Sequence, residues 1–309
     1  MKIFTQKIYI PLLFLAAAGV VQAQTPLDAI MMKQREACIA LTYDHGTFDQ
    51  YWEGTYLRKN ETIATVTRTT IAPMIAIGLH DRLNLYVGVP YVKTESSEPN
   101  GGLMHGAKGF QDLSLAVKFK AINKEIGKGK LEVLAAGGFA TPITNYLSDY
   151  RPYSLGNGTN EWSIRGIVQY KLNMGLYARV AGGHLFRGQT KIERDYYYAN
   201  GSYYTSWMDV PSAWEYNAAV GMWLLDNSLK IEASYYLLNS TSGDDIRKYN
   251  AAQPTNKVNF DQVNFSLQYY FFKQVKGLGV IAYYSQMLNG RNMGKFTNIG
   301  GGLTYQFKI

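Results

Sequence analysis

The last twelve residues of the chain, 298–309 (NIGGGLTYQFKI), decide the fold. Read at alternate positions, one set is apolar and consists of Ile299, Leu303, Tyr305, Phe307 and Ile309. The other set is small or polar and consists of Asn298, Gly300, Gly302, Thr304, Gln306 and Lys308. A period of two puts the two sets on opposite faces of a β-strand. The stretch therefore predicts a terminal strand with one apolar and one polar face.

The first 23 residues have the pattern of a secretory signal peptide. Lys2 and Lys7 precede an apolar run, and small residues stand at the cleavage position, so we expect Gln24 to begin the mature chain. This run is too short for a spanning helix, and no later segment approaches the roughly 18 continuous apolar residues that such a helix needs. The sequence therefore favours strands over helices as the elements that cross a membrane.

The same alternation recurs along the chain and predicts twelve strands. They cover residues 36–45, 62–79, 83–94, 110–122, 130–142, 161–172, 176–188, 213–225, 228–238, 258–272, 278–287 and 295–309. Each even-numbered strand except the last is followed by a tight turn, and each odd-numbered strand by a longer segment. Short turns at one end and long loops at the other are typical of bacterial outer-membrane barrels.

We therefore predict an all-β protein, a transmembrane antiparallel β-barrel of 12 strands spanning residues 36–309. Its short turns would be periplasmic and its long loops extracellular. Residues 24–35 would be either a periplasmic N-terminal segment or a plug in the lumen, and the tail is slightly favoured because chain termini are often poorly ordered.

The strand pattern assigns side chains to the two faces of the barrel. Apolar residues predicted to face lipid include Leu115, Val117, Ile231, Phe265 and Leu267. Aromatic residues at the strand ends would form two girdles, with Trp162 and Trp214 at the outer interface and Phe119, Tyr170, Phe271 and Phe307 at the inner one.

The inward face is rich in charge. The residues predicted to line the lumen are Asp112, Lys118, Lys120, Glu132, Arg165, Arg179, Glu215, Lys230 and Glu232. They would form either a network of ion pairs that fills the barrel or a polar constriction that selects solutes. Lys118 or Lys120 is expected to lie near Glu132, because one hairpin places all three on the same face.

The fourth long loop is aromatic. Its candidate contact residues are Tyr196, Tyr197, Tyr198, Tyr203, Tyr204 and Trp207, which surround Asn200-Gly201. Tyrosines favour strands, so a hairpin taller than the membrane explains them. A stacking platform for a solute or a contact surface for a partner explains them equally well.

The sequence gives little sign of catalysis. The four histidines have no serine or acid arranged with them as a nucleophile and base, so we predict no enzyme and no cofactor. Asp44, His45 and Asp49 are ordinary solvated loop residues more readily than metal ligands. The formal charge falls from +8 to +6 once Lys2 and Lys7 are removed. Because the chain is secreted, this excess suits lipid phosphates, including those of lipopolysaccharide, or an anionic solute better than nucleic acid.

Three runs of residues carry a family resemblance. They are Phe48–Gly54 with Arg58 and Asn60, then Gly78-Leu79 with Asp81, Leu83-Asn84 and Pro90–Val92, and then Gly106 with Gly109–Leu113 and Lys118. Together they resemble the transporter-like outer-membrane barrels of the MetA-pathway phenol-degradation family. The match covers the first third of the chain best. The resemblance implies import of aromatic compounds, and it assigns no ligand-binding residues.

Two functions follow as expectations. The first is an integral protein of the bacterial outer membrane that acts as a channel or transporter for small solutes, aromatic or amphiphilic ones included. The alternative is an interaction or assembly barrel whose extracellular loops bind a protein partner.

Overall fold

The fold was obtained as a computed structural model that describes residues 25–101, 103–247, 252–271 and 275–309. The predicted signal peptide, the mature N-terminus at Gln24 and the predicted end of the tenth strand at residue 272 lie outside the described residues. No helix in the described ranges is long and apolar enough to cross a bilayer.

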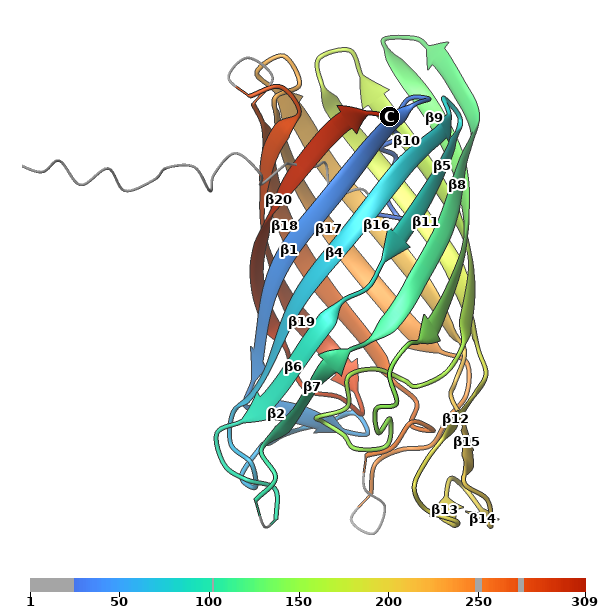
Figure 1. The fold of residues 1–309 in the computed structure, drawn as a ribbon, viewed down its shortest axis with the longest axis vertical. Helices are drawn as coiled ribbons and strands as arrows, with labels where there is room; N and C mark the ends of the chain where they lie inside the picture. Colours follow the sequence, from blue (N-terminus) through green and yellow to red (C-terminus); the bar gives the residue numbers. More distant parts are fainter. Residues whose placement is uncertain (1–24, 102, 248–251, 272–274) are drawn as a thin grey trace, which may run out of the picture.

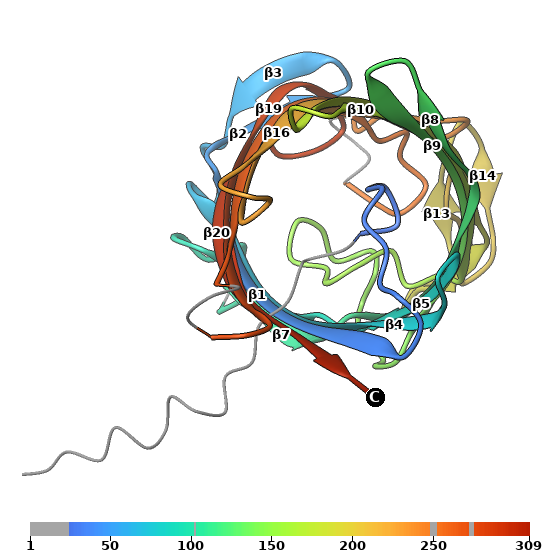
Figure 2. The same ribbon diagram turned by 90° about the horizontal axis from the view of Figure 1, so that it is seen from above.

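Fourteen strand segments form one closed antiparallel sheet (Figures 1 and 2). They are β1 (Glu36–Phe48), β4 (Val66–His80), β5 (Leu83–Gly88), β6 (Tyr91–Ser96), β7 (Gly106–Phe110), β8 (Asp112–Ile126), β9 (Gly129–Pro142), β10 (Glu161–Leu172), β11 (Leu176–Arg187), β16 (Ala213–Leu224), β17 (Leu229–Ser240), β18 (Asn259–Tyr270), β19 (Leu278–Arg291) and β20 (Thr297–Lys308). The segments make twelve membrane strands, because β5 with β6 and β7 with β8 are each two halves of one strand. The predicted fold is thereby confirmed.

The cylinder closes between the first and last strands. β1 pairs with β20 in an unbroken antiparallel register from Glu36↔Lys308 to Thr47↔Thr297. β1 also pairs with β4 along its other edge, so neither edge of β1 is left free. A closed ladder satisfies the backbone hydrogen bonds of every strand within a bilayer.

The two interruptions lie side by side on neighbouring strands. Pro90 separates β5 from β6, as expected of a residue that cannot donate to a ladder. Gln111 separates β7 from β8, and its backbone N–H donates to the Pro90 carbonyl at 2.9 Å. The ladder thus continues across both breaks. β7 extends the fourth strand beyond its predicted start at Phe110.

The connections differ at the two ends of the barrel. Tight turns lie at the end that carries the C-terminus, at the top of Figure 1. Asp226 and Asn227 both have positive φ in one of these turns, as their residue types favour. The opposite end carries the long loops and three small two-stranded sheets: β2 (Gln50–Glu53) with β3 (Tyr56–Lys59), β12 (Gln189–Lys191) with β15 (Trp207–Asp209), and β13 (Tyr197–Tyr198) with β14 (Ser202–Tyr203).

The outer surface is apolar, as predicted. Leu115, Val117, Ile231, Phe265 and Leu267 are between 37% and 54% exposed, whereas Gln268 beside Leu267 is only 6% exposed. Trp162 and Trp214 are also exposed and lie near the ends of their strands on the loop side, where a girdle was expected. This surface can contact lipid, while the polar residues point inward.

Residues 25–35 lie inside the barrel and form a plug, so the favoured interpretation as a tail is wrong for this segment (Figure 2). Ala29 packs against Leu134 and Ile167, and Met32 packs against Tyr86. Gly78 lets the segment approach the wall, because a Cβ at this position would lie 1.9 Å from the Lys33 carbonyl oxygen. The sequence left the plug as the less favoured of two alternatives because the side chains of this segment have no strand period.

Candidate functional site

The lumen is the candidate site, and all nine residues predicted to line it point inward in the structure. Lys118, Glu132, Arg179, Glu215 and Lys230 are buried, and the other four are partly buried. Nearly all are partnered, because burying an unpaired charge away from water is costly. The pairs divide into a periplasmic half, near the tight turns, and an outer half.

The Glu232 carboxylate collects three partners in the periplasmic half. Arg179 binds it through both terminal nitrogens at 2.9 Å, which is the bidentate geometry of a strong charge-assisted pair. Lys230 Nζ lies 3.1 Å from the same carboxylate, and the Tyr177 hydroxyl donates to it at 2.6 Å. This cluster cross-links β11 and β17 across the intervening β16.

Lys120 and Lys118 have different partners. Lys120 Nζ binds Glu132 at 2.8 Å, and Gln169 donates to the other oxygen of Glu132 at 3.1 Å. Lys118 Nζ instead binds the plug residue Asp28 at 2.9 Å and also donates to the Thr25 and Asp28 carbonyls at 2.8 and 3.0 Å. The expected pairing with Glu132 therefore holds for Lys120, whereas Lys118 anchors the plug.

The outer half contains two further ion pairs. Arg165 binds Glu215 at 2.5 Å, and the Tyr236 hydroxyl donates to the second oxygen of Glu215 at 3.0 Å. Arg187 binds Glu161 at 2.7 Å. The structural interpretation of the inward charges, a network of ion pairs, thus accounts for most of them in both halves.

A long loop, residues 143–160, folds into the outer half of the barrel. Tyr153 and Leu155 in this loop are almost completely buried. Arg68 on β4 fixes the loop by donating to the Leu155 carbonyl at 2.6 Å and to the Ser154 carbonyl at 3.2 Å. Thr94, which lies directly opposite Arg68 on the neighbouring strand β6, donates from its hydroxyl to the Tyr153 carbonyl at 2.6 Å. The loop is thereby held as part of the inner wall.

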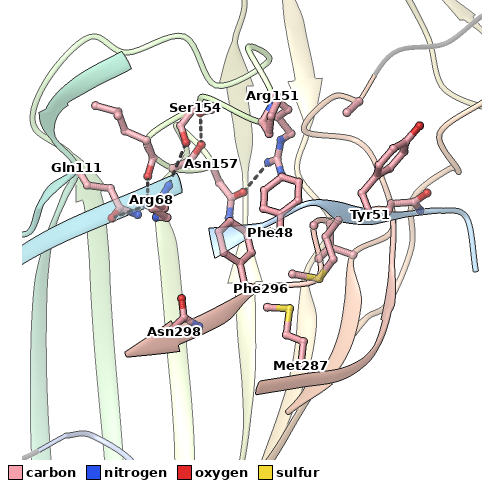
Figure 3. Close-up of a pocket in the computed structure, with 18 of the residues that line it drawn as sticks. Phe48, Tyr51, Arg68, Gln111, Arg151, Ser154, Asn157, Met287, Phe296 and Asn298 are labelled. Carbon is pink, nitrogen blue, oxygen red and sulfur yellow. Dashed lines mark hydrogen bonds between the residues drawn. The ribbon is translucent and has the colours of Figure 1, made fainter. Parts of the chain in front are cut away.

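A cavity of about 1010 Å³ lies between this loop and the barrel wall (Figure 3). Its volume is at the upper end of the range usual for small-molecule sites. The apolar part of its lining includes Phe48, Ile63, Leu155, Met287 and Phe296, and the charged part consists of Asp44, Arg68, Asp112, Arg151 and Glu161. An apolar pocket with a few polar groups is typical of binding sites for amphipathic molecules.

The aromatic loop stands beyond the outer end of β11 and β16. Tyr197 stacks on Tyr203 with ring centroids 5.0 Å apart, and Asn200 has positive φ at the tip of the hairpin, where a turn was expected. Of the six candidates only Tyr197 is buried, and Tyr204 is 85% exposed. The group therefore does not line the cavity; it forms an exposed patch on the extracellular side.

The residues weighed as metal ligands do not converge. Asp44 faces the cavity, whereas its neighbour His45 lies on the opposite face of β1, where its ring bonds to the Thr69 hydroxyl at 3.2 Å. Across the described parts of the chain, no group of three or more His, Cys, Asp or Glu residues has a geometry that could hold a metal ion.

Three charged residues of the cavity lining, Arg68, Arg151 and Glu161, were not predicted from the sequence. Arg68 could have been predicted from the strand period, because it stands two residues after the inward-facing Val66 on β4 and therefore on the same, lumen-facing side. Arg151 could not, since it lies in a loop without a period.

Closure into twelve strands, the apolar outer face and the polar lumen define the class: this is an integral β-barrel of the bacterial outer membrane. No protein-family model and no curated protein matches the chain. Its structure is similar to that of the COG4313 outer membrane channel from Pseudomonas putida F1, with a TM-score of 0.72 at 13% identity, over 92% of this chain and 100% of that one. The translocator domain of autotransporter NalP from Neisseria meningitidis aligns with a TM-score of 0.47 at 12% identity, over 90% of each chain. At 13% identity, the similarity to the channel from Pseudomonas putida F1 establishes the fold.

Proposed function

We propose that this protein is an outer-membrane channel that admits small solutes, aromatic or amphiphilic ones included. The observation that carries the proposal is the large outer cavity, which combines an apolar wall with charged groups. The polar inward face continues from this cavity towards the periplasm. The similarity in fold to a solved outer-membrane channel supports the same function.

In this proposal the cavity receives the solute and the plug controls its onward passage. The cavity lining contains no residue of the plug, which lies nearer the tight turns and contacts Lys118. A solute in the cavity would reach the periplasm only when residues 25–35 move. The ion-paired side chains then form the wall of the path through the lumen. A solute can pass along them while the backbone hydrogen bonds between the strands stay intact.

Conductance and solute flux test this proposal directly. Purified protein in planar bilayers should give discrete current steps, and liposomes that contain it should swell in small neutral solutes. Deleting residues 25–34 should increase both signals, whereas shortening the hairpin at 199–202 should leave them unchanged. If neither the intact protein nor the plug deletion conducts ions or admits solutes, the channel proposal is wrong.

The aromatic hairpin favours a second candidate function, the binding of a protein partner. Tyr196, Tyr203 and Trp207 are each at least 44% exposed, and Tyr204 is almost fully exposed. Exposed aromatic groups are enriched at protein interfaces. If a partner copurifies from native membranes, and replacing Tyr204 and Trp207 with serine releases it, this second function gains support, particularly for a protein that shows no conductance.

We also propose lipopolysaccharide as a lipid partner of the outer wall. Lys93 on β6 and Lys108 on β7 are directly opposite each other and exposed, next to the outward pair Tyr91 and Phe110. Like charges at opposite positions repel unless an anion lies between them. The nearby carboxylate of Glu95 forms an ion pair with Lys93 and not with Lys108. Replacing both lysines with glutamine should lower the amount of lipopolysaccharide that copurifies with the barrel; an unchanged amount contradicts the proposal.

A further inference from the structure

Arg151 is a cation at the cavity with no carboxylate partner. Its side chain is partly buried and lines the cavity. One terminal nitrogen donates to the Asn157 side-chain oxygen at 2.8 Å, and Nε is buried without a hydrogen-bond partner (Figure 3). Among the ion pairs between described residues, none includes Arg151.

The neighbouring charges do not neutralise Arg151. Burial, followed by repulsion from the guanidiniums of Arg187 and Arg68, lowers the pKa of Arg151 to about 10. Arg151 therefore remains charged near neutral pH, at a cost that a bound anion would relieve. An unpaired buried cation beside two others is an environment that favours binding of a negative group.

The carboxylates that line the cavity already have partners. Glu161 is bound to Arg187 at 2.7 Å, and Asp112 accepts a hydrogen bond from the Tyr146 hydroxyl. Asp44 interacts with the hydroxyl of Tyr283 on the barrel wall. These acids therefore have local interactions, and Arg151 is the guanidinium of the lining that keeps a buried nitrogen without a hydrogen-bond partner.

An apolar surface lies next to Arg151. The rings of Phe48 and Phe296 meet edge to face with centroids 4.7 Å apart, and both line the cavity with Met287. Figure 3 shows these three side chains on the same side of the cavity, below Arg151 in that view. A guanidinium above an aromatic and thioether surface suits a molecule with one anionic end and an apolar body.

We infer that the outer cavity binds a small amphipathic monocarboxylate, with the carboxylate held by Arg151 and the apolar body against Phe48, Phe296 and Met287. A guanidinium matches the planar geometry of a carboxylate, and one negative charge balances the charge of Arg151. This inference rests on the proposed function, since it names the class of solute that enters the channel.

A series of ligands with one body and three head groups tests the inference. The probes are 3-phenylpropionate, 3-phenylpropanol and 3-phenylpropylamine, titrated by calorimetry into the intact protein in detergent. The acid should bind at least on the order of tenfold more tightly than the alcohol, because only the carboxylate adds the attraction of opposite charges and a bidentate pair with the guanidinium. Equal affinities for acid and alcohol, or tightest binding of the amine, would overturn the inference without any variant.

Variants then locate the carboxylate site. Arg151→Gln should remove the preference for the acid over the alcohol, and Arg151→Lys should retain part of that preference. Arg194→Gln is the matched control, because it removes an exposed loop guanidinium that binds Asp149 outside the cavity. Folding of each variant is checked by the mobility of the unheated barrel on a gel. A folded Arg151→Gln protein that still prefers the acid contradicts the assignment of Arg151.

Flux measurements separate this inference from the channel proposal. If small neutral solutes pass through the protein but the acid binds no more tightly than the alcohol, the channel proposal holds and the carboxylate site is refuted. Acid-selective binding without any conductance or flux would support the site and refute the channel.

Discussion

The anchor between Lys118 and the plug can be tested by replacing Asp28 with alanine. The Lys118 side chain is completely buried, and Asp28 supplies the one carboxylate bound to it. After the replacement, Lys118 would retain two backbone carbonyl partners and an uncompensated charge. Removing one partner of a buried ion pair costs about 3–5 kcal/mol. We expect the plug to leave the lumen so that water can hydrate Lys118.

The size of the expected shift follows from this cost. A change of about 1.36 kcal/mol alters an equilibrium tenfold, so the released state of the plug should gain between two and four powers of ten in population. The barrel strands do not depend on Asp28 and should stay intact. Hydrogen exchange at residues 25–35 should therefore accelerate greatly, while exchange in the β1–β20 ladder stays slow.

Two controls make the experiment decisive. Asp81→Ala removes an exposed contact, the bond from the Gln34 N–H to the Asp81 carboxylate at 2.9 Å, and should have a far smaller effect. Replacing Asp28 with alanine and Lys118 with methionine together should restore much of the protection, because no unpaired charge remains. Equal exchange in Asp28→Ala and wild type would refute the argument that this pair holds the plug.

Three more predictions concern the barrel itself. Leu267→Arg places a charge in lipid and should destabilise the protein by about 2–4 kcal/mol in a denaturant titration in bilayers, whereas Gln268→Arg, inside the lumen, should cost less; the reverse order would mean that the strand faces are inverted. Replacing Glu132 alone with alanine should destabilise more than replacing Glu132 and Lys120 together with apolar residues, and strict additivity in a double-mutant cycle would exclude their coupling. Arg179→Ala should lower the cation count of the lumen and shift single-channel ion preference towards cations, and an unchanged reversal potential under a salt gradient would place Arg179 outside the conducting path.

The sequence was sufficient for the barrel because lipid outside and polar groups inside impose a period of two on every strand. That constraint predicted the strands, the faces of Leu267 and Gln268, and the proximity of Lys118 or Lys120 to Glu132. It did not decide between a plug and a tail for residues 24–35, and it did not place the loop that carries Arg151. Those segments are positioned by contacts across the lumen, from Lys118 and from Arg68, and such contacts leave no periodic trace in the chain.

The position of the plug has a kinetic consequence. Residues 25–35 are joined directly to the first residue of β1, and the Arg35 N–H donates to the Gly78 carbonyl at 3.0 Å. A tethered occupant acts at an effective concentration in the millimolar range for short flexible links. A dilute external solute competes poorly against it. Opening of the barrel would then be a first-order event with a frequency set by the protein, and the supply of solute would affect uptake only in the intervals when the tethered segment is out.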